Sequence, residues 1–385
     1  MMENNKISNG MKIGIDCRLW GQAGVGRYVR NLVFNLLKID ESNVYVLFIR
    51  REEVEIVQNQ IAKFKIQNSK FKIIPVKIPW HSIKEQLLFS KLIDKEKVDL
   101  MHFPYFSVPL FYNKPFVVTI HDLIYHHFVS GEASTLPLWL YGFKMISYRL
   151  IIKHAAGSAR KIIAVSQFTK RDIMNNLGIK EEKIEVISEA ADDFNRLSVQ
   201  SFQGVPLQDY FLYVGNVYRH KNPGALIEAF KILHKENPKL KLVFVGKEDF
   251  FYKNLKKKFS KLINQKSIIF KDNISDQELA SLYKNAICLV RPSLMEGFSL
   301  PPLEAMSAKG IVLASDIPVH REIFDDAVIY FDTYKIDDLI SKMKFLLNIE
   351  REEKNKIIKK GIEKTKEYSW RITAEQTLKV YESSL

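Results

Sequence analysis

Short apolar runs alternate with amphipathic segments along most of the chain. In the first half, these runs predict buried strands at residues 11–17, 44–50, 71–76, 98–103, 115–120 and 161–166. Between most of them, apolar residues recur with the 3.6-residue period of a helix, as Val29, Leu32, Val33 and Leu36 do. This alternation is typical of a parallel sheet that helices cover on both faces.

The same alternation starts again after a polar, irregular segment at residues 195–209. The second series predicts strands at residues 210–216, 241–246, 267–270, 286–292, 310–315 and 327–331. Residues 369–385 then show a helical pattern with no strand behind them. The sequence predicts two Rossmann-like domains with parallel sheets that face a cleft, at residues 1–200 and 201–368. The closing helix, 369–385, is expected to cross back to the domain junction.

Composition and charge narrow the class of protein. The 385 residues are 46% hydrophobic, as in a globular protein, and the two cysteines, Cys17 and Cys288, are expected to be buried free thiols. No signal peptide or membrane-spanning run is visible, so a cytoplasmic location is expected. The net charge of +14 allows nucleic acid, an anionic membrane or a phosphorylated substrate as partner. No nucleic-acid-binding motif appears, so nucleic acid is not expected.

One segment keeps a membrane partner open. Residues 136–161 combine aromatic and basic side chains, which suits an interfacial surface that meets a lipid-linked acceptor at the inner face of the plasma membrane. An ordinary packed helix with solvated lysines is the alternative.

Candidate ligand-binding residues follow two of the strands predicted in the first half of the chain. Gly21, Gly24 and Gly26 precede a helix, where backbone N–H groups can face an anion, although a flexible turn is the alternative. His121 ends the strand at 115–120 and can hydrogen-bond a substrate near neutral pH, unless it is a satisfied core histidine. The nearby pair His126-His127 lacks metal-ligand spacing, so no metal site is predicted.

Basic residues follow the first strand of the second series. Gly215 ends that strand, and Arg219 and Lys221 precede Asn222-Pro223, which suits the start of a helix. Two fixed cations beside a helix N-terminus can grip a diphosphate. Scattered surface charge is the alternative, because the chain is basic throughout.

Two glutamates flank a short uncharged stretch in LMEGFSLPPLE, residues 294–304. Pro301-Pro302 fit the first turn of a helix, which puts Glu304 in that turn and Glu296 in the preceding loop. The eight-residue separation favours two contacts along one elongated ligand over a coupled acid–base pair. Ordinary helix-capping acids are the alternative.

EGFSLPPLEAM resembles the E-x7-E signature of retaining glycosyltransferases of family four, which have the GT-B fold. Further stretches agree in order, among them GIDCR with GVGRY, VTIHDL, AVSQFTKRDI and YVGN…KN…LIEAF. IPVHREIFDDAVIYFD and the closing YSW…A…Y helix also resemble the family, so the likeness spans about residues 11–383. The opening GIDCR…GVGRY is most similar to the mannosyltransferase-like branch that assembles bacterial surface polysaccharides.

The resemblance implies an acceptor-binding N-terminal domain and a C-terminal domain that binds a sugar nucleotide. It implies catalytic roles for His121, Glu296 and Lys221. Glu304 would accept from the ribose hydroxyls, and Glu296 from those of the transferred sugar. The implied donor-binding residues are Gly215, Arg219, Lys221, Glu296, Gly297, Phe298, Ser299, Leu300 and Glu304. Gly24, Val25, Gly26 and Ser166 would face the diphosphate or the acceptor.

Two departures from the family pattern weaken individual roles. Relatives commonly carry arginine directly before the matching Lys221, where this chain has His220. Arg321 stands where many relatives have proline, so Glu322 is given only a supporting role.

These motifs contain no evident carboxylate nucleophile for double displacement. Front-face attack is therefore favoured, with the leaving phosphate taking the acceptor's proton, basic side chains in place of a metal, and no cofactor. The resemblance to the mannosyltransferase-like branch alone implies GDP-mannose as the favoured donor, and a UDP-hexose is the alternative. An epimerase or phosphorylase on the same two-domain frame, and a nucleic-acid-binding protein, are the competing classes.

Overall fold

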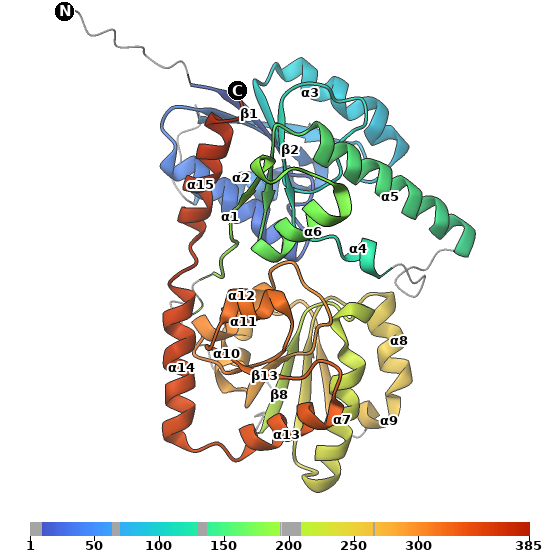
Figure 1. Cartoon of the computed structure of the whole chain (residues 1–385), viewed down its shortest axis with the longest axis vertical. Coiled ribbons are helices and arrows are strands. Elements are labelled where there is room, and N and C mark those ends of the chain that lie inside the picture. Colours follow the sequence, from blue (N-terminus) through green and yellow to red (C-terminus); the bar gives the residue numbers. More distant parts are fainter. Residues whose placement is uncertain (1–9, 64–69, 129–136, 193, 195–208, 265) are drawn as a thin grey trace, which may run out of the picture. The chain divides into compact units, whose positions relative to one another are not determined.

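Two α/β units, each with its own parallel sheet, make up the described part of the chain (Figure 1). The computed structural model describes residues 10–63, 70–128, 137–192, 194, 209–264 and 266–385. Unit 1 contains the chain up to His126, the stretch that ends at Glu189, and the closing segment Trp370–Leu385. Unit 2 contains Ala190–Ser369 and the short stretch that starts at His127.

The sheet of unit 1 has seven parallel strands in the order β3-β2-β1-β4-β5-β6-β7. Its central strands are apolar on both faces, and Ile13, Val46 and Val118 are fully buried, because helices cover both sides. The strands are β1 (Lys12–Asp16), β2 (Val44–Arg50), β3 (Phe71–Val76), β4 (Leu100–Phe103), β5 (Phe116–Ile120), β6 (Lys161–Ala164) and β7 (Ile184–Val186).

The closing segment of the chain, Trp370–Leu385, belongs to unit 1. Its packing at the domain junction stays a prediction. Helix α15 runs alongside α1 (Figure 1). The Trp370 and Tyr28 rings have centroids 6.0 Å apart. The helices of unit 1 are α1 (Gly24–Ile39), α2 (Val54–Ala62), α3 (Ser90–Glu96), α4 (Ile124–His127), α5 (Leu138–Ser158), α6 (Gln167–Leu177) and α15 (Trp370–Glu382). Shorter helical turns are η1 (Arg51–Glu53), η3 (Glu85–Phe89) and η5 (Glu181–Lys183).

The sheet of unit 2 has six parallel strands in the order β10-β9-β8-β11-β12-β13. They are β8 (Tyr210–Val214), β9 (Lys241–Val245), β10 (Ile268–Lys271), β11 (Cys288–Arg291), β12 (Val312–Ser315) and β13 (Ile329–Phe331). The helical elements are η7 (Arg219–Lys221), α7 (Pro223–Glu236), α8 (Phe250–Lys258), α9 (Ser260–Asn264), α10 (Asp276–Asn285), α11 (Leu300–Ser307), α12 (Pro318–Phe324), α13 (Ile336–Leu347) and α14 (Arg351–Thr365).

The structure confirms the predicted alternation, and both cysteines are buried free thiols. Two details differ. The edge strand β7 was not predicted, because three residues are too few to show a pattern. Helix α1 begins at Gly24, so Gly24, Val25 and Gly26 form its first turn and not a preceding loop. The predicted linker at 195–209 and the boundary at residue 200 lie almost wholly outside the described residues.

The strand order reverses once in each sheet. In unit 1 the strands are added on one side of β1 up to β3, and β4 then lies on the other side of β1, so the reversal lies between the neighbouring strands β1 and β4. In unit 2 the reversal lies in the same way between the neighbouring strands β8 and β11. In open parallel sheets, ligands bind beyond the carboxyl ends of the strands at such switch points. The segments after these four strands are therefore where functional side chains are expected.

Candidate donor site in unit 2 and candidate residues of unit 1

The switch point of unit 2 brings together the loops after β8 and β11. The first carries Gly215 and leads through η7 to Lys221, and the second carries Glu296 and leads into α11. The two loops are tied directly, because the backbone N–H of Leu294 donates to the carbonyl of His220 at 2.7 Å. Residues 75 positions apart in the sequence therefore meet, as Lys221 and Glu296 do.

Glu296 is the centre of a buried charge cluster, with only 3% of its surface exposed. Its Oε1 accepts from the Arg291 guanidinium and from the Ser293 hydroxyl, each at 2.6 Å, and its Oε2 accepts from Lys221. Burial alone would raise the pKa of Glu296. The charges of Arg291 and Lys221 outweigh it and hold that pKa well below its ordinary value. Glu296 is thus a fixed carboxylate.

Arg291 is a site residue that the sequence interpretation missed. It ends β11, is 4% exposed, and spreads its guanidinium over three partners. Besides Glu296, it donates to the Val214 carbonyl at 3.0 Å and to the Ser299 hydroxyl at 3.1 Å. One side chain therefore links the end of β8, the acid Glu296 and the residue that precedes α11.

Gly215 stands against this arginine. Its φ of +132° lies in a region that L side chains rarely adopt, and a Cβ at this position would lie 3.0 Å from Nη1 of Arg291. The absence of a side chain lets β8 turn closely past the guanidinium. The glycine predicted at this strand end thus has a steric reason.

Helix α11 begins at Leu300, with Pro301 and Pro302 in its first turn as predicted. Glu304 is its fifth residue and so lies in the second turn, which corrects the prediction that put it in the first. It is 4% exposed and accepts a hydrogen bond from the Tyr283 hydroxyl at 2.8 Å. Glu296 and Glu304 therefore have different partners.

The residues between the two acids are packed into unit 2. Gly297, Phe298, Ser299 and Leu300 are all buried, and Ser299 has a φ of 84°. Their contact with a donor stays a prediction.

The loop after β8 differs in detail from its prediction. Arg219 is exposed, and Asn222 precedes α7 in a left-handed conformation without a side-chain cap, so it does not cap the helix as predicted. Burial and the neighbouring Lys221 lower the pKa of His220 to about 3, which keeps its imidazole neutral. Lys221, with 12% of its side chain exposed, is thus the less exposed cation of this loop.

In unit 1, His121 follows β5 and both of its ring nitrogens are engaged. Nδ1 lies 2.8 Å from the Glu189 carboxylate, and Nε2 lies 2.9 Å from the Pro104 carbonyl. Burial would lower the pKa of His121, but the hydrogen bond and charge of Glu189 outweigh it, so the pKa lies above its ordinary value. Since both partners are acceptors, the ring is held as a double donor.

Ser166 follows β6 and caps α6, where its hydroxyl accepts from the backbone N–H of Thr169 at 3.0 Å. It is fully buried. The Thr169 hydroxyl in turn donates to the His121 carbonyl at 3.2 Å. In this structure Ser166 supports the position of His121, and its contact with a ligand stays a prediction.

The glycines of α1 differ from one another. A Cβ on Gly26 would lie 2.6 Å from the carbonyl oxygens of Leu19 and Trp20, whereas a Cβ on Gly24 would meet nothing within 4 Å. Gly26 is therefore required by packing. Gly24 has no such requirement, and its role toward a ligand stays a prediction.

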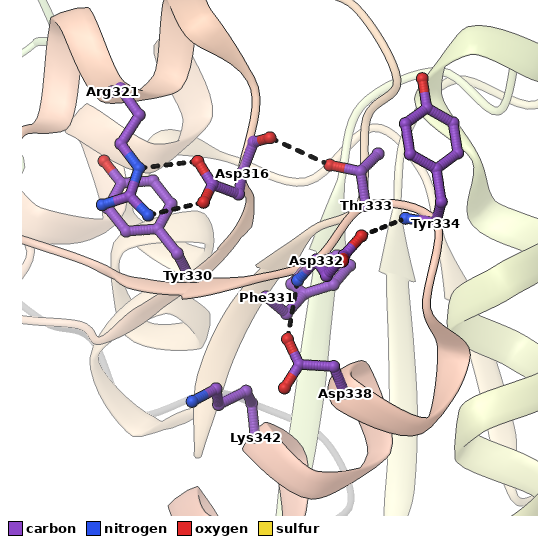
Figure 2. Close-up of a pocket in the computed structure, with 9 residues that line it drawn as sticks. All are labelled: Asp316, Arg321, Tyr330, Phe331, Asp332, Thr333, Tyr334, Asp338 and Lys342. Atoms are coloured by element: carbon purple, nitrogen blue, oxygen red, sulfur yellow. Dashed lines mark hydrogen bonds and ion pairs between the residues drawn. The ribbon is translucent and has the colours of Figure 1, made fainter.

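An open cavity of about 420 Å³ lies at the carboxyl ends of β12 and β13 (Figure 2). Arg321 pairs with both carboxylate oxygens of Asp316 at 2.6 Å and stacks over the Tyr330 ring at 3.7 Å. The described residues that line it include none of the predicted site residues. Arg321 therefore serves local packing, and the supporting role of Glu322 stays a prediction.

Within the described residues, no group of three or more His, Cys, Asp or Glu side chains is placed to hold a metal ion. No helix in that part of the chain is long and apolar enough to cross a membrane.

Comparison with known proteins agrees with this geometry. The family model Glycosyltransferase Family 4 matches residues 23–193, and the model Glycosyl transferases group 1 matches residues 202–364. The O-antigen chain mannosyltransferase RfbU of Salmonella typhimurium is 26% identical over 273 residues, which cover 71% of this chain and 70% of that protein. The O-antigen chain mannosyltransferase B of Escherichia coli is 27% identical over 237 residues, 58% of this chain and 61% of that protein.

A solved structure of Anabaena Alr3699/HepE, in complex with UDP and glucose, superposes with a TM-score of 0.73 at 16% identity, over 97% of this chain and 100% of that one. At this identity the likeness concerns the fold, which is GT-B. The fold and the two family models define a glycosyltransferase. The chain belongs to glycosyltransferase family 4, whose members are retaining enzymes that use nucleotide-sugar donors.

Proposed function

We propose that this enzyme transfers mannose from GDP-mannose to a saccharide or lipid-linked saccharide during the assembly of a bacterial surface polysaccharide. The observation that carries the donor site is the buried cluster of Glu296, Lys221 and Arg291 at the switch point of unit 2. The choice of mannose is supported by the two relatives from Salmonella and Escherichia, which are O-antigen chain mannosyltransferases. A UDP-hexose is the alternative donor, which the UDP-bound Anabaena structure supports.

The cluster suggests a role for each group in the reaction. Lys221 and Arg291 would stabilise the diphosphate that leaves, Glu296 would accept from hydroxyls of the transferred sugar, and Glu304 from those of the ribose. The bond from the anomeric carbon to the phosphate oxygen breaks as the acceptor oxygen attacks from the same face. The acceptor's proton goes to the leaving phosphate. His121, whose two nitrogens both donate, is not arranged to take that proton.

A donor screen tests this proposal. The protein is incubated with GDP-mannose, UDP-glucose, UDP-galactose and UDP-N-acetylglucosamine, and the free nucleotide released by slow hydrolysis is measured. We expect release from GDP-mannose to exceed that from the UDP-sugars at least tenfold. Faster release from a UDP-sugar would overturn the choice of donor, and no release or thermal shift with any of them would overturn the donor site.

Helix α5 supports a membrane as second partner. Trp139, Phe143, Ile146 and Leu150 recur at helical spacing on its solvent face and are 66%, 65%, 58% and 58% exposed. The helix also carries Lys144, Arg149 and Lys153 and contains no Asp or Glu. We propose that this face docks on anionic lipid, with the apolar stripe in the interface and the basic residues against the headgroups.

Vesicle flotation tests this docking. Binding to phosphatidylglycerol vesicles is expected, with little binding to phosphatidylcholine and loss of binding at high salt. Phe143→Glu should abolish it, whereas Tyr334→Glu, at an 85% exposed tyrosine of unit 2, should not. Equal binding of the wild type and Phe143→Glu would refute the docking surface.

A further inference from the structure

Three aromatic side chains gather at the carboxyl end of the unit 1 sheet. Trp80 and His81 follow β3 and stack with ring centroids 3.7 Å apart at 20°, and the Tyr105 ring, after β4, lies 5.4 Å from that of Trp80. His81 is exposed, and Trp80 and Tyr105 are half-buried. They lie beside the β1–β4 switch point, where a ligand of this unit is expected.

A buried ionic network fixes this aromatic platform, which we define as Trp80, His81 and Tyr105. Glu85 is fully buried, and it accepts from the backbone N–H of His81 at 2.8 Å and from the Ser107 hydroxyl at 3.1 Å. It also pairs with Arg18, after β1, at 2.5 Å. The segments after three strands are thus held by one carboxylate, which preorganises the platform.

Arg18 links Glu85 of this network to Asp16 and to the Phe89 ring. Its guanidinium makes a bidentate pair with Asp16 at 2.8 and 2.6 Å and lies 3.7 Å over the Phe89 ring. Burying the charges of Arg18, Asp16 and Glu85 costs free energy even when they are paired, and apolar side chains would fill the same space at lower cost. Packing alone therefore does not explain this ionic network. Arg18 Nη1 has no hydrogen-bond partner within the described part of the chain.

The platform lies near His121, the unit 1 residue for which the family resemblance implies a catalytic role. The Tyr105 ring lies 6.4 Å from the ring of His121, and the same segment supplies the Pro104 carbonyl that His121 binds. A ligand that lies on Trp80 and Tyr105 would therefore extend toward His121. Phe106, the next residue in this segment, is only 7% exposed and packs into the core, whereas Trp80 keeps part of its surface in solvent.

We propose that Trp80, His81 and Tyr105 form a subsite for a pyranose ring of the acceptor saccharide. The apolar C–H face of a pyranose suits the electron-rich face of an indole or phenol ring, while its hydroxyl rim suits polar groups such as Asp16, which is linked to the platform through Arg18 and Glu85 and is 11% exposed. The proposal rests on the proposed function for the identity of the ligand as an acceptor, but not for saccharide binding itself.

Direct binding is tested first, without any donor. Saturation-transfer NMR is recorded with the methyl α-glycosides of mannose, glucose, galactose and N-acetylglucosamine. At least one glycoside should receive saturation from the wild type and from Trp80→Phe, and Trp80→Ala should lose it. Phe111→Ala, which removes a 69% exposed aromatic ring of the same unit, should not lose it. No saturation with the wild type, or equal saturation with Trp80→Ala, would overturn the subsite.

Kinetics then separate the subsite from the donor site. With the best glycoside as acceptor, Trp80→Ala should raise the acceptor KM at least tenfold and leave slow donor hydrolysis within twofold of the wild type. A parallel fall in donor hydrolysis, or an unchanged acceptor KM, would overturn the acceptor role. If the wild type binds saccharide but hydrolyses no sugar nucleotide, the proposed function fails while the saccharide subsite stands.

Discussion

The pair of Lys221 and Glu296 couples recognition of the diphosphate to recognition of the sugar. In the structure Lys221 donates to Oε2 of Glu296. A diphosphate that engages Lys221 has to take it from the carboxylate, and that exchange frees Oε2 for a sugar hydroxyl. Glu296→Gln removes the charge while keeping the side-chain shape. We expect it to change the affinity for nucleotide and the rate of transfer in opposite directions.

The geometry sets the size of both effects. A hydrogen bond to a charged group contributes about 1.5–3 kcal/mol. Because 12% of the Lys221 side chain is exposed and water can replace part of this bond, the lower end applies, which is roughly tenfold in Kd. Glu296→Gln should therefore bind free GDP about tenfold more tightly. Transfer should fall about 100-fold, since the amide is a weaker acceptor for the sugar hydroxyl.

Isothermal titration with GDP and UDP, and steady-state transfer with the preferred donor, measure the two effects. Glu304→Gln is the control, because Glu304 has Tyr283 and not Lys221 as its partner, and this variant should weaken nucleotide binding. The coupling is wrong if Glu296→Gln binds free nucleotide with unchanged or lower affinity while remaining folded, as thermal melting would show.

Three further outcomes follow from the same structure. Gly215→Ala should lower the free energy of unfolding by about 1–3 kcal/mol, because of the positive φ of Gly215 and the nearby Arg291 guanidinium. Gly224→Ala, with open space around it, should not lower the free energy of unfolding, and denaturant melts of the two variants measure the difference. Arg291→Met should lower it by about 3–5 kcal/mol, because a buried carboxylate loses a cation, and unchanged stability would contradict the burial argument. Glu189→Gln should lower the pKa of His121 in an NMR titration. Because the folded-state pKa of His121 is raised above its ordinary value, the stabilisation by the Glu189–His121 pair is full below about pH 6.5 and is lost as the pH rises through the higher, folded-state pKa. The wild type and Glu189→Gln should therefore converge in stability at alkaline pH.

Periodicity was sufficient to predict the architecture. Runs of apolar residues bounded by polar loops marked twelve of the thirteen strands in the part of the chain that the structure describes, because strands buried on both faces leave a continuous apolar signal. The prolines at 301 and 302 likewise located the start of α11. Only the edge strand β7 was missed.

The contacts between side chains were harder to predict than the helices and strands. Arg291 lies at the end of an apolar run and was counted as part of a strand, although a charged residue at the carboxyl end of a buried strand is a signal for a site. Lys221 and Glu296 were predicted to bind separate parts of a ligand. Their contact depends on how the loops after β8 and β11 meet, which spacing along the chain does not encode.

Local geometry also distinguishes the two glycines of α1, which the sequence pattern does not. A Cβ on Gly26 would lie 2.6 Å from backbone oxygens, whereas a Cβ on Gly24 would meet nothing within 4 Å. The aromatic platform was not predicted at all, since its three side chains come from two separate loops.

The central claim is that a sugar nucleotide is cleaved and its sugar transferred with retention. The most direct test is NMR of the first product formed from GDP-α-mannose and the best acceptor found in the glycoside screen. The anomeric proton and its one-bond carbon coupling report the configuration. The account predicts an α-mannoside at the earliest time points. A β-mannoside would contradict it.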